Sequence, residues 1–222
     1  TYTPYNHYYA WKKVNNEDES AKRGADQVKT IVAGVYEPNR FIEIIRDFVY
    51  FPDKKHDKEE EVVCRYPQFF ATRMLRESVL NAYFANSRKG GTYFGATGCG
   101  KTYTMMFLAR QLSLRCTELG SPTIVMIVDR DDLQTQAGKL FLRSEEFLSL
   151  GAAKIIADRK ELKTELSIRE SGGFFICTIQ KFCEEIGELN TRKNIICFSD
   201  EAHRSQVRLN TQLKVKDQKA KS

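Results

Sequence analysis

The sequence predicts an α/β fold with a mainly parallel sheet that is covered by helices on both faces. Continuous apolar runs at 123–128, 174–178 and 195–198 alternate with segments of helical periodicity. Strands that are buried on both faces give such continuous runs, because neither face meets water. A glycine-rich loop also stands between a short β-type segment and an apolar helix, which is where nucleotide-binding folds carry a phosphate loop.

The glycine-rich loop spans residues 95–102 and reads GATGCGKT, which satisfies the pattern G-x-x-x-x-G-K-[ST]. We expect a strand at 92–94 before it and a helix that begins near Lys101 after it. Its backbone N–H groups and the positive end of the helix dipole would hold phosphate, with Lys101 on the β- and γ-phosphates. Thr102 would offer its hydroxyl to Mg²⁺. The expected nucleotide-binding residues of the loop are Gly95, Ala96, Thr97, Gly98, Cys99, Gly100, Lys101 and Thr102.

A second motif lies about a hundred residues downstream, where 194–204 reads NIICFSDEAHR. A buried-type strand there ends in two adjacent carboxylates, Asp200 and Glu201. Asp200 would hold Mg²⁺, while Glu201 would orient or deprotonate the attacking water. A solvated turn is the alternative for Asp-Glu alone, but the phosphate loop upstream favours a site for ATP and Mg²⁺.

The composition is that of a soluble chain with room for a full core. Of 222 residues 41% are hydrophobic, and 35 Lys and Arg against 29 Asp and Glu give a net charge of +6, which permits a nucleic-acid partner without requiring one. Six cysteines form no C-x-x-C pair, so we expect reduced thiols and a cytoplasmic protein. No apolar run is long enough to span a membrane. The first residue is Thr1, and we expect the chain to be a piece of a longer protein.

The N-terminal part is expected to be a separate helical segment. Tyr and Trp side chains cluster within residues 1–16, which favours an arm that packs on a neighbouring domain over one that stacks on bases. Helical patterns follow at 21–35 and 40–51, and then comes a charge run at 53–61. We therefore divide the chain into a linker of residues 1–58 and an ATPase lobe of residues 59–222.

Two further sites have competing interpretations. Gln68, which follows Tyr66 and Pro67 before a helix, could present both a donor and an acceptor to adenine, or it could be an ordinary surface glutamine. Asp158, Glu161 and Lys163 resemble a metal-dependent nuclease triad, but their spacing places them in one helix, so we interpret the match as chance.

The motifs in this order resemble a known family. RYPQ, GATGCGKT, DRDDLQTQ, CTIQKF and DEAHRSQ are similar to the first RecA-like lobe of superfamily 2 motors, and specifically to the motor (R) subunit of type I restriction endonucleases. The N-terminal YYAWKKVN and RFIEIIRDFVYF resemble the linker between nuclease and motor in that family.

The resemblance implies an ATP-driven translocase of double-stranded DNA that works with methyltransferase and specificity subunits. Gln68 would contact adenine, and His203 would couple the nucleotide state to movement. Arg130, Thr178 and Gln180 would lie toward the duplex. The family's nuclease domain, second RecA-like lobe and arginine finger have no counterpart in these 222 residues, so we expect ATP binding with little turnover.

Two other functions remain open at this point. One is a lobe of another superfamily 2 DNA or RNA helicase, against which DRDDLQTQ and the RSQ after DEAH argue. The other is a nucleotide-gated interaction module without turnover. Restoring a second lobe and comparing RNA with DNA stimulation would distinguish the three.

Overall fold

The computed structural model describes residues 9–22, 24–51, 61–87, 89–96, 98–128, 136–151, 153–178 and 190–200. The side chains of 136–138 are outside this description. The chain divides into two compact units, Thr1–Cys116 and Thr117–Ser222. The predicted linker boundary at residue 58 stays a prediction.

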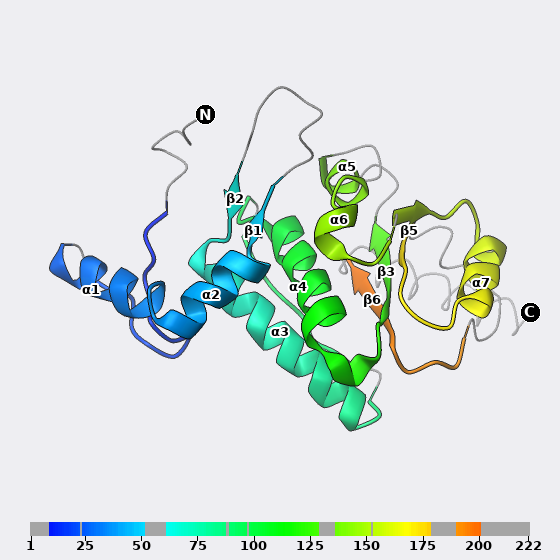
Figure 1. Ribbon diagram of the computed structural model, residues 1–222, viewed down its shortest axis with the longest axis horizontal. Coiled ribbons are helices and arrows are strands. Elements are labelled where there is room, and N and C mark those ends of the chain that lie inside the picture. The colour runs from blue at the N-terminus through cyan, green and yellow to red at the C-terminus, as the bar shows by residue number, and fades with distance from the viewer. Residues whose placement is uncertain are drawn as a thin grey trace, which may run out of the picture. The chain divides into compact units, whose positions relative to one another are not determined.

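The first unit is mainly helical (Figure 1). In chain order its elements are α1 (Ala25–Gly34), α2 (Pro38–Asp47), β1 (Val49–Tyr50), β2 (Val62–Val63), α3 (Tyr66–Phe84) and α4 (Lys101–Arg115). β1 and β2 pair antiparallel, and α3 packs along α4. The contacts of this unit thus join residues from both sides of position 58.

Aromatic side chains form the centre of the first unit. Phe48 lies 5.0 Å from Phe69 and 5.3 Å from Phe107, measured between ring centroids. Trp11 is buried against Phe69 and Phe70, at 5.7 and 6.3 Å. The prediction that the N-terminal aromatic residues pack rather than stack on bases is therefore confirmed for Trp11.

The ends of the first two helices differ from those predicted. The helix expected at 21–35 begins only at Ala25, and the one expected at 40–51 is α2, which begins at Pro38 and ends at Asp47. Proline is favoured at a first helical position, because the missing N–H has no partner there. The carboxylate of Glu37 accepts hydrogen bonds from the backbone N–H groups of Asn39 and Arg40 and so caps α2.

The second unit contains a four-stranded, fully parallel sheet in the order β4-β5-β3-β6. Its elements are the 3₁₀ turn η2 (Thr117–Leu119), β3 (Thr123–Val128), α5 (Gln136–Leu142), α6 (Glu145–Leu148), β4 (Ala153–Ile155), α7 (Arg159–Ile168), β5 (Phe174–Thr178) and β6 (Ile195–Ser199). Every residue of β3 and β5 is buried, as their continuous apolar sequences predict.

Helices cover both faces of this sheet, so the predicted fold class is confirmed. On one face Leu162 and Leu166 of α7 join a buried cluster with strand residues such as Val125 and Phe175. On the other face Phe141 of α5 stacks on Phe174, with ring centroids 5.3 Å apart and planes inclined by 13°. Neighbouring side chains of a strand point to opposite faces of the sheet. Phe174 therefore packs against α5, while Phe175 packs against α7.

The expected strand at 92–94 is absent, because the structure gives Thr92–Phe94 no strand conformation. A strand requires a backbone partner, whereas the four-stranded sheet consists entirely of segments after Thr117 and the two-stranded sheet only of β1 and β2. Phe94 is 95% exposed, which is unlike a residue of a buried strand.

Candidate functional site: the phosphate loop and the carboxyl edge of the sheet

The phosphate loop leads directly into α4, which begins at Lys101 as predicted. Gly100 is the N-cap residue, with a left-handed backbone at φ 84° and ψ 38°, and no side chain caps this helix. The first N–H groups of a helix have no partner within it, so an uncapped start can donate them to an anion.

Two glycines of the loop are fixed by space or backbone geometry. Gly98 and Gly100 have φ values of 78° and 84°, a conformation that side chains with a Cβ rarely adopt. A Cβ on Gly100 would also lie 2.3 Å from the Nε2 atom of Gln68. Gly98 and Gly100 therefore allow the curled backbone, and Gly100 also allows a close approach to α3.

The side chains of Lys101 and Cys99 each make a contact beside the phosphate loop. The ammonium of Lys101 donates a hydrogen bond to the carbonyl oxygen of Gly95 at 3.1 Å. The Sγ atom of Cys99 lies 3.8 Å from the hydroxyl of Tyr93. Burial, together with that contact to Cys99, raises the pKa of Tyr93 to about 12, so the phenol stays neutral beside the loop. No sequence motif pointed to a role for Tyr93 at this loop.

Gln68 lies against the loop, but its amide is already engaged within the protein. It is 4% exposed. Its Oε1 atom accepts from the N–H of Arg65 at 2.7 Å, and its Nε2 atom donates to the carbonyl oxygen of Gly100 at 3.1 Å. One N–H of the amide and one lone pair of its oxygen are not used by these two bonds. The expected contact of Gln68 with adenine therefore stays a prediction.

The second unit gathers predicted residues at the carboxyl edge of its sheet. Thr178 ends β5 and pairs with Val128 at the end of β3, and it is 3% exposed. Asp200 follows β6, and its N–H donates to the carbonyl oxygen of Ile127 on β3 at 3.0 Å. Because neighbouring strands are about 4.8 Å apart, Thr178 and Asp200 lie roughly 10 Å apart on either side of β3. Ligand sites of open parallel sheets lie at this edge.

The remaining predicted residues are outside the described part of the chain. These are Thr97 in the phosphate loop, Arg130 and Gln180 toward DNA, and Glu201 and His203 in the DEAH motif.

The nuclease-like triad is a helix cap, in agreement with its interpretation as chance. Asp158 is the N-cap of α7 and accepts from the N–H of Glu161 at 2.9 Å. Glu161 reaches back to the N–H of Ala157. This reciprocal pair satisfies free N–H groups at the helix start.

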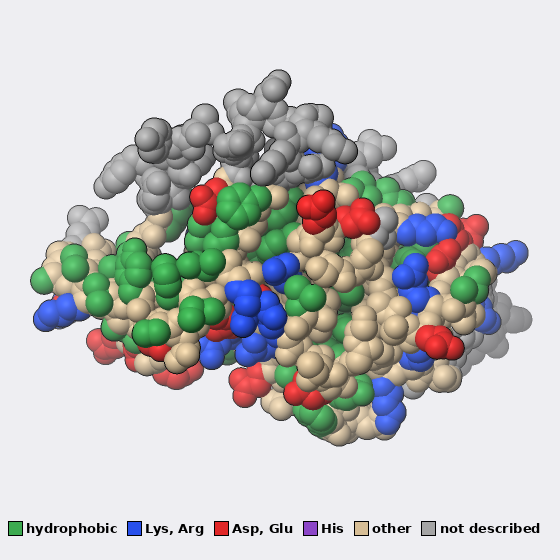
Figure 2. All heavy atoms as spheres, in the orientation of Figure 1, with side chains coloured by type: hydrophobic (Ala, Val, Ile, Leu, Met, Phe, Trp, Pro, Cys, Tyr) green, Lys and Arg blue, Asp and Glu red, His purple; other side chains and the backbone are tan. Residues whose placement is uncertain are grey.

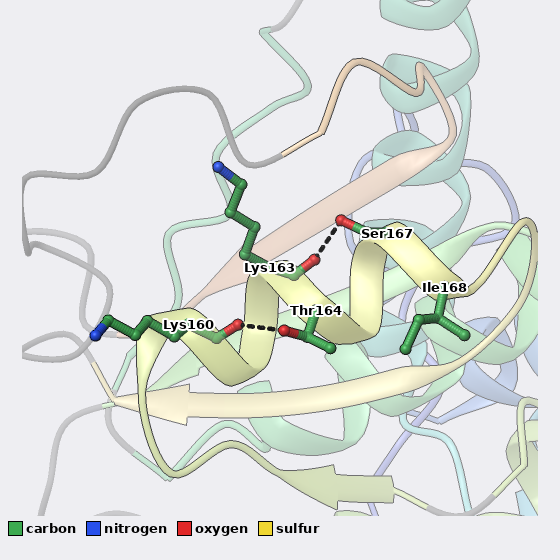
Figure 3. Close-up of a pocket in the computed structure, with 5 residues that line it drawn as sticks. All are labelled: Lys160, Lys163, Thr164, Ser167 and Ile168. Carbon is green, nitrogen blue, oxygen red and sulfur yellow. Dashed lines mark hydrogen bonds between the residues drawn. The ribbon is translucent and has the colours of Figure 1, made fainter.

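A hollow of about 390 Å³ lies along the outer face of α7 (Figure 3). Its lining residues are Lys160, Lys163, Thr164, Ser167 and Ile168. Both hydroxyls are used within the helix, since Thr164 donates to the Lys160 carbonyl and Ser167 to the Lys163 carbonyl. The hollow includes none of the residues predicted to bind nucleotide or DNA.

An ionic cluster in the first unit was not predicted from the sequence. Asp47 is fully buried and accepts hydrogen bonds from Arg115, Arg46 and Gln111, with Arg115 bidentate at 2.8–3.1 Å. Burial alone would raise the pKa of Asp47, but the hydrogen bonds from Arg115 and Arg46 outweigh burial and hold the pKa below its ordinary value. The pairing of Asp47 with Arg115 could not be predicted from local patterns, because the two residues are 68 positions apart in the sequence.

The parallel sheet and the phosphate loop are features of α/β nucleotide-binding proteins. The family model described as SWI2/SNF2 ATPase matches residues 67–219, which include both motifs. The chain belongs to the SWI2/SNF2 ATPase family.

Curated relatives carry restriction-enzyme names. The type I restriction enzyme HindI endonuclease subunit of Haemophilus influenzae is 34% identical over 206 residues, covering 88% of this chain and 19% of the relative. The putative type I restriction enzyme MjaIXP endonuclease subunit of Methanocaldococcus jannaschii is 32% identical over 184 residues, covering 79% of this chain and 16% of the relative. The chain thus spans less than a fifth of the length of these relatives.

No described helix is both long and apolar enough to cross a membrane.

Proposed function

We propose that this chain is the ATP-binding motor lobe of a type I restriction enzyme endonuclease subunit, which couples ATP hydrolysis to translocation along double-stranded DNA before cleavage. The observation that carries the proposal is the uncapped start of α4 at Lys101, preceded by a loop in which Gly98 and Gly100 have positive φ values. The relatives' names and the family of ATPases support the same assignment.

The residues present fit ATP and Mg²⁺. The first N–H groups of α4 would bind phosphate oxygens, and the ammonium of Lys101 would exchange the Gly95 carbonyl for a phosphate. Thr102 and Asp200 would hold Mg²⁺ through a hydroxyl and a carboxylate, which are ligands of the kind it prefers. The metal would supply charge neutralisation at the phosphates.

Hydrolysis would depend on the DEAH motif. Glu201 would accept a proton from the attacking water or orient it, and His203 would couple the nucleotide state to movement. Gln68 would sense the nucleotide from α3, through adenine or through its bond to Gly100. Arg130, Thr178 and Gln180 would bind the duplex, chiefly through its phosphates. The methyltransferase and specificity subunits of a restriction-modification complex would be the protein partners, in the cytoplasm.

The test is thermal stabilisation of the 222-residue chain by ATP with Mg²⁺. A ligand that binds the folded state raises the melting temperature as its concentration exceeds the dissociation constant. We expect that rise for the parent and its loss in Lys101→Ala. Lys160→Ala, on the outer face of α7, is the control and should be stabilised like the parent. Equal stabilisation of Lys101→Ala and the parent would contradict the assignment of the phosphate loop.

A further inference from the structure

A surface of the first unit, separate from the phosphate loop, joins exposed apolar side chains to a cluster of arginines. α2 exposes Phe41, Ile42 and Ile45, at 37%, 58% and 55% of their full accessible surface. Arg46 follows them, and Ile42, Ile45 and Arg46 have the i, i+3, i+4 spacing that places residues on one side of a helix. We call Phe41, Ile42, Ile45 and Arg46 the α2 stripe.

The apolar part continues onto α1. Val28, Ile31 and Val32 are 63%, 39% and 55% exposed, and the ring of Tyr36 lies 5.4 Å from that of Phe41. Figure 2 shows hydrophobic side chains over both helices, with Lys and Arg side chains gathered beside them. Single exposed apolar residues are common, but a group of this kind on a water-soluble surface indicates an interaction site.

The arginines next to the stripe are held in place and carry excess positive charge. Arg46, Arg110 and Arg115 surround the single carboxylate of Asp47, with the nearest N–O distances at 2.9, 3.7 and 2.8 Å. The side chains of Arg46 and Arg115 remain 47% and 30% exposed. Glu43 also lies near Arg46 and pairs with Arg76 at 3.8 Å, so four cations face two anions and positive charge still remains toward the surface. The buried Asp47 fixes the guanidinium groups before any partner arrives.

This arrangement differs from both nucleotide and nucleic-acid sites. Arg110 and Arg115 lie in the C-terminal half of α4, and Arg115 is about 20 Å along the helix from Lys101 at a rise of roughly 1.5 Å per residue. Nucleic-acid interfaces are polar and strongly basic, and exposed Ile and Phe side chains have no function on a phosphate backbone. Apolar side chains combined with arginine are typical of the centre of a protein interface.

We propose that the α2 stripe, with Arg110 and Arg115, docks a protein segment that presents apolar side chains flanked by carboxylates. The arginines would pair with those carboxylates through bidentate hydrogen bonds, and the segment's apolar face would cover Ile42 and Ile45. Charge complementarity selects this occupant over a second copy of the chain, because two copies of the stripe facing each other would bring arginines together.

The experiment selects peptides from a random library displayed on phage, using the full 222-residue chain as the target. We expect the enriched peptides to carry Asp or Glu together with Leu, Ile or Phe. As synthetic peptides they should lose at least about tenfold in affinity for Ile42→Ser and for Arg46→Ala. Ile168→Ser, which alters an apolar residue that is 76% exposed on α7, and Lys160→Ala are the matched controls and should bind like the parent.

The same variants are also tested for binding to a DNA duplex and to anionic lipid vesicles. The proposal is overturned if no acidic-apolar peptide is enriched, if the peptides bind Ile42→Ser as well as the parent, or if these two variants lose DNA or vesicle binding in place of peptide binding. Concentration-dependent sedimentation of the parent that Ile42→Ser abolishes would assign the surface to a second copy and overturn it too. Thermal melting of each variant checks that the fold is kept. We expect this because Ile42 is exposed and because Asp47 keeps its hydrogen bonds from Arg115 and Gln111 when Arg46 is replaced.

Discussion

The side-chain amide of Gln68 donates a hydrogen bond to the carbonyl oxygen of Gly100, at 3.1 Å, and so ties the start of α3 to the end of the phosphate loop. The same amide accepts the N–H of Arg65 at the N-cap of α3. One buried side chain therefore holds a helix start and the carbonyl that precedes Lys101.

We predict that Gln68→Ala destabilises the chain by about 1–2 kcal/mol, because the partly buried carbonyl of Gly100 and the N–H of Arg65 at the helix N-cap each lose a partner. Chemical denaturation measures this loss. Gly100→Ala should be more damaging, since it needs an unfavourable backbone conformation and would put a Cβ 2.3 Å from Nε2. In the double variant part of that clash is relieved. Its loss of unfolding free energy should therefore be smaller than the sum of the losses in the two single variants. Additive losses would mean that Gln68 and Gly100 do not interact.

Substitutions of Asp200 and Glu201 are expected to affect ATP binding and ATP hydrolysis differently. Asp200→Asn should weaken Mg²⁺-dependent ATP binding, because it removes a charged metal ligand. Glu201→Gln in the full-length parent protein should keep binding but lose hydrolysis by orders of magnitude, because an amide cannot accept a proton. Calorimetric titration and a steady-state ATPase assay measure the two quantities. Turnover of Glu201→Gln within about threefold of the parent would remove Glu201 from the chemistry.

The 222-residue chain should hydrolyse ATP very slowly, with or without linear duplex DNA. Lys101 and Mg²⁺ supply only part of the charge that stabilises the transferring phosphoryl group, and in related motors an arginine from a second lobe completes it. Such an arginine is typically worth about a thousandfold in rate. An assay of phosphate release checks this, and DNA-stimulated turnover at the rate of a whole motor would show that the argument from the second lobe is wrong.

Asp47→Asn should destabilise the first unit by about 3 kcal/mol at neutral pH, because the amide leaves arginines without their buried counter-charge. The pKa of Asp47 is lowered in the folded protein, so the stability that it contributes is complete above the ordinary value of 3.8 and is lost as pH falls through the folded-state pKa. The difference in unfolding free energy between parent and variant should therefore shrink below about pH 4. Urea titrations across that range measure it, and a difference independent of pH would show that the charge of Asp47 is not its source.

Gly34→Ala tests the docking of the N-terminal arm. A Cβ at this position would lie 2.7 Å from Nε1 of Trp11 and 3.2 Å from the carbonyl oxygen of Lys13. We expect a loss of about 1–3 kcal/mol and greater exposure of Trp11, measured by its fluorescence. Ala33→Gly, next to it on α1, is a control for helix propensity. An unshifted emission maximum in Gly34→Ala would mean that Trp11 does not need this close approach.

Local patterns predicted the strands of the second unit well. β3 and β5 have the predicted bounds, because a strand buried on both faces needs an apolar residue at every position. The start of α4 at Lys101 also followed from the loop pattern. In contrast, the segment at 92–94 has strand-like residues but no backbone partner in the described sheet, and sequence gives no information on whether a partner is present.

The sequence did not reveal contacts between distant residues. The helical pattern at 40–51 was recognised, but it did not show that Phe41 and Ile45 would be exposed or that Asp47 would be buried beside Arg110 and Arg115 of α4. Gln68 was identified, but its bond to Gly100 could not be foreseen from a pattern that names residues one segment at a time. The roles of Arg130, Gln180, Glu201 and His203 stay predictions that rest on sequence alone.

The position of β3 between β5 and β6 has a consequence for how the chain is made. β3 is synthesised first of the four strands, but its second neighbour, β6, leaves the ribosome last. Until then one edge of a strand with five consecutive apolar residues has unpaired N–H and C=O groups, which is the condition that favours pairing between different chains. A chain that stops before Ile195 should therefore aggregate rather than fold, and the demand on chaperones should be greatest in the interval between the synthesis of β3 and that of β6.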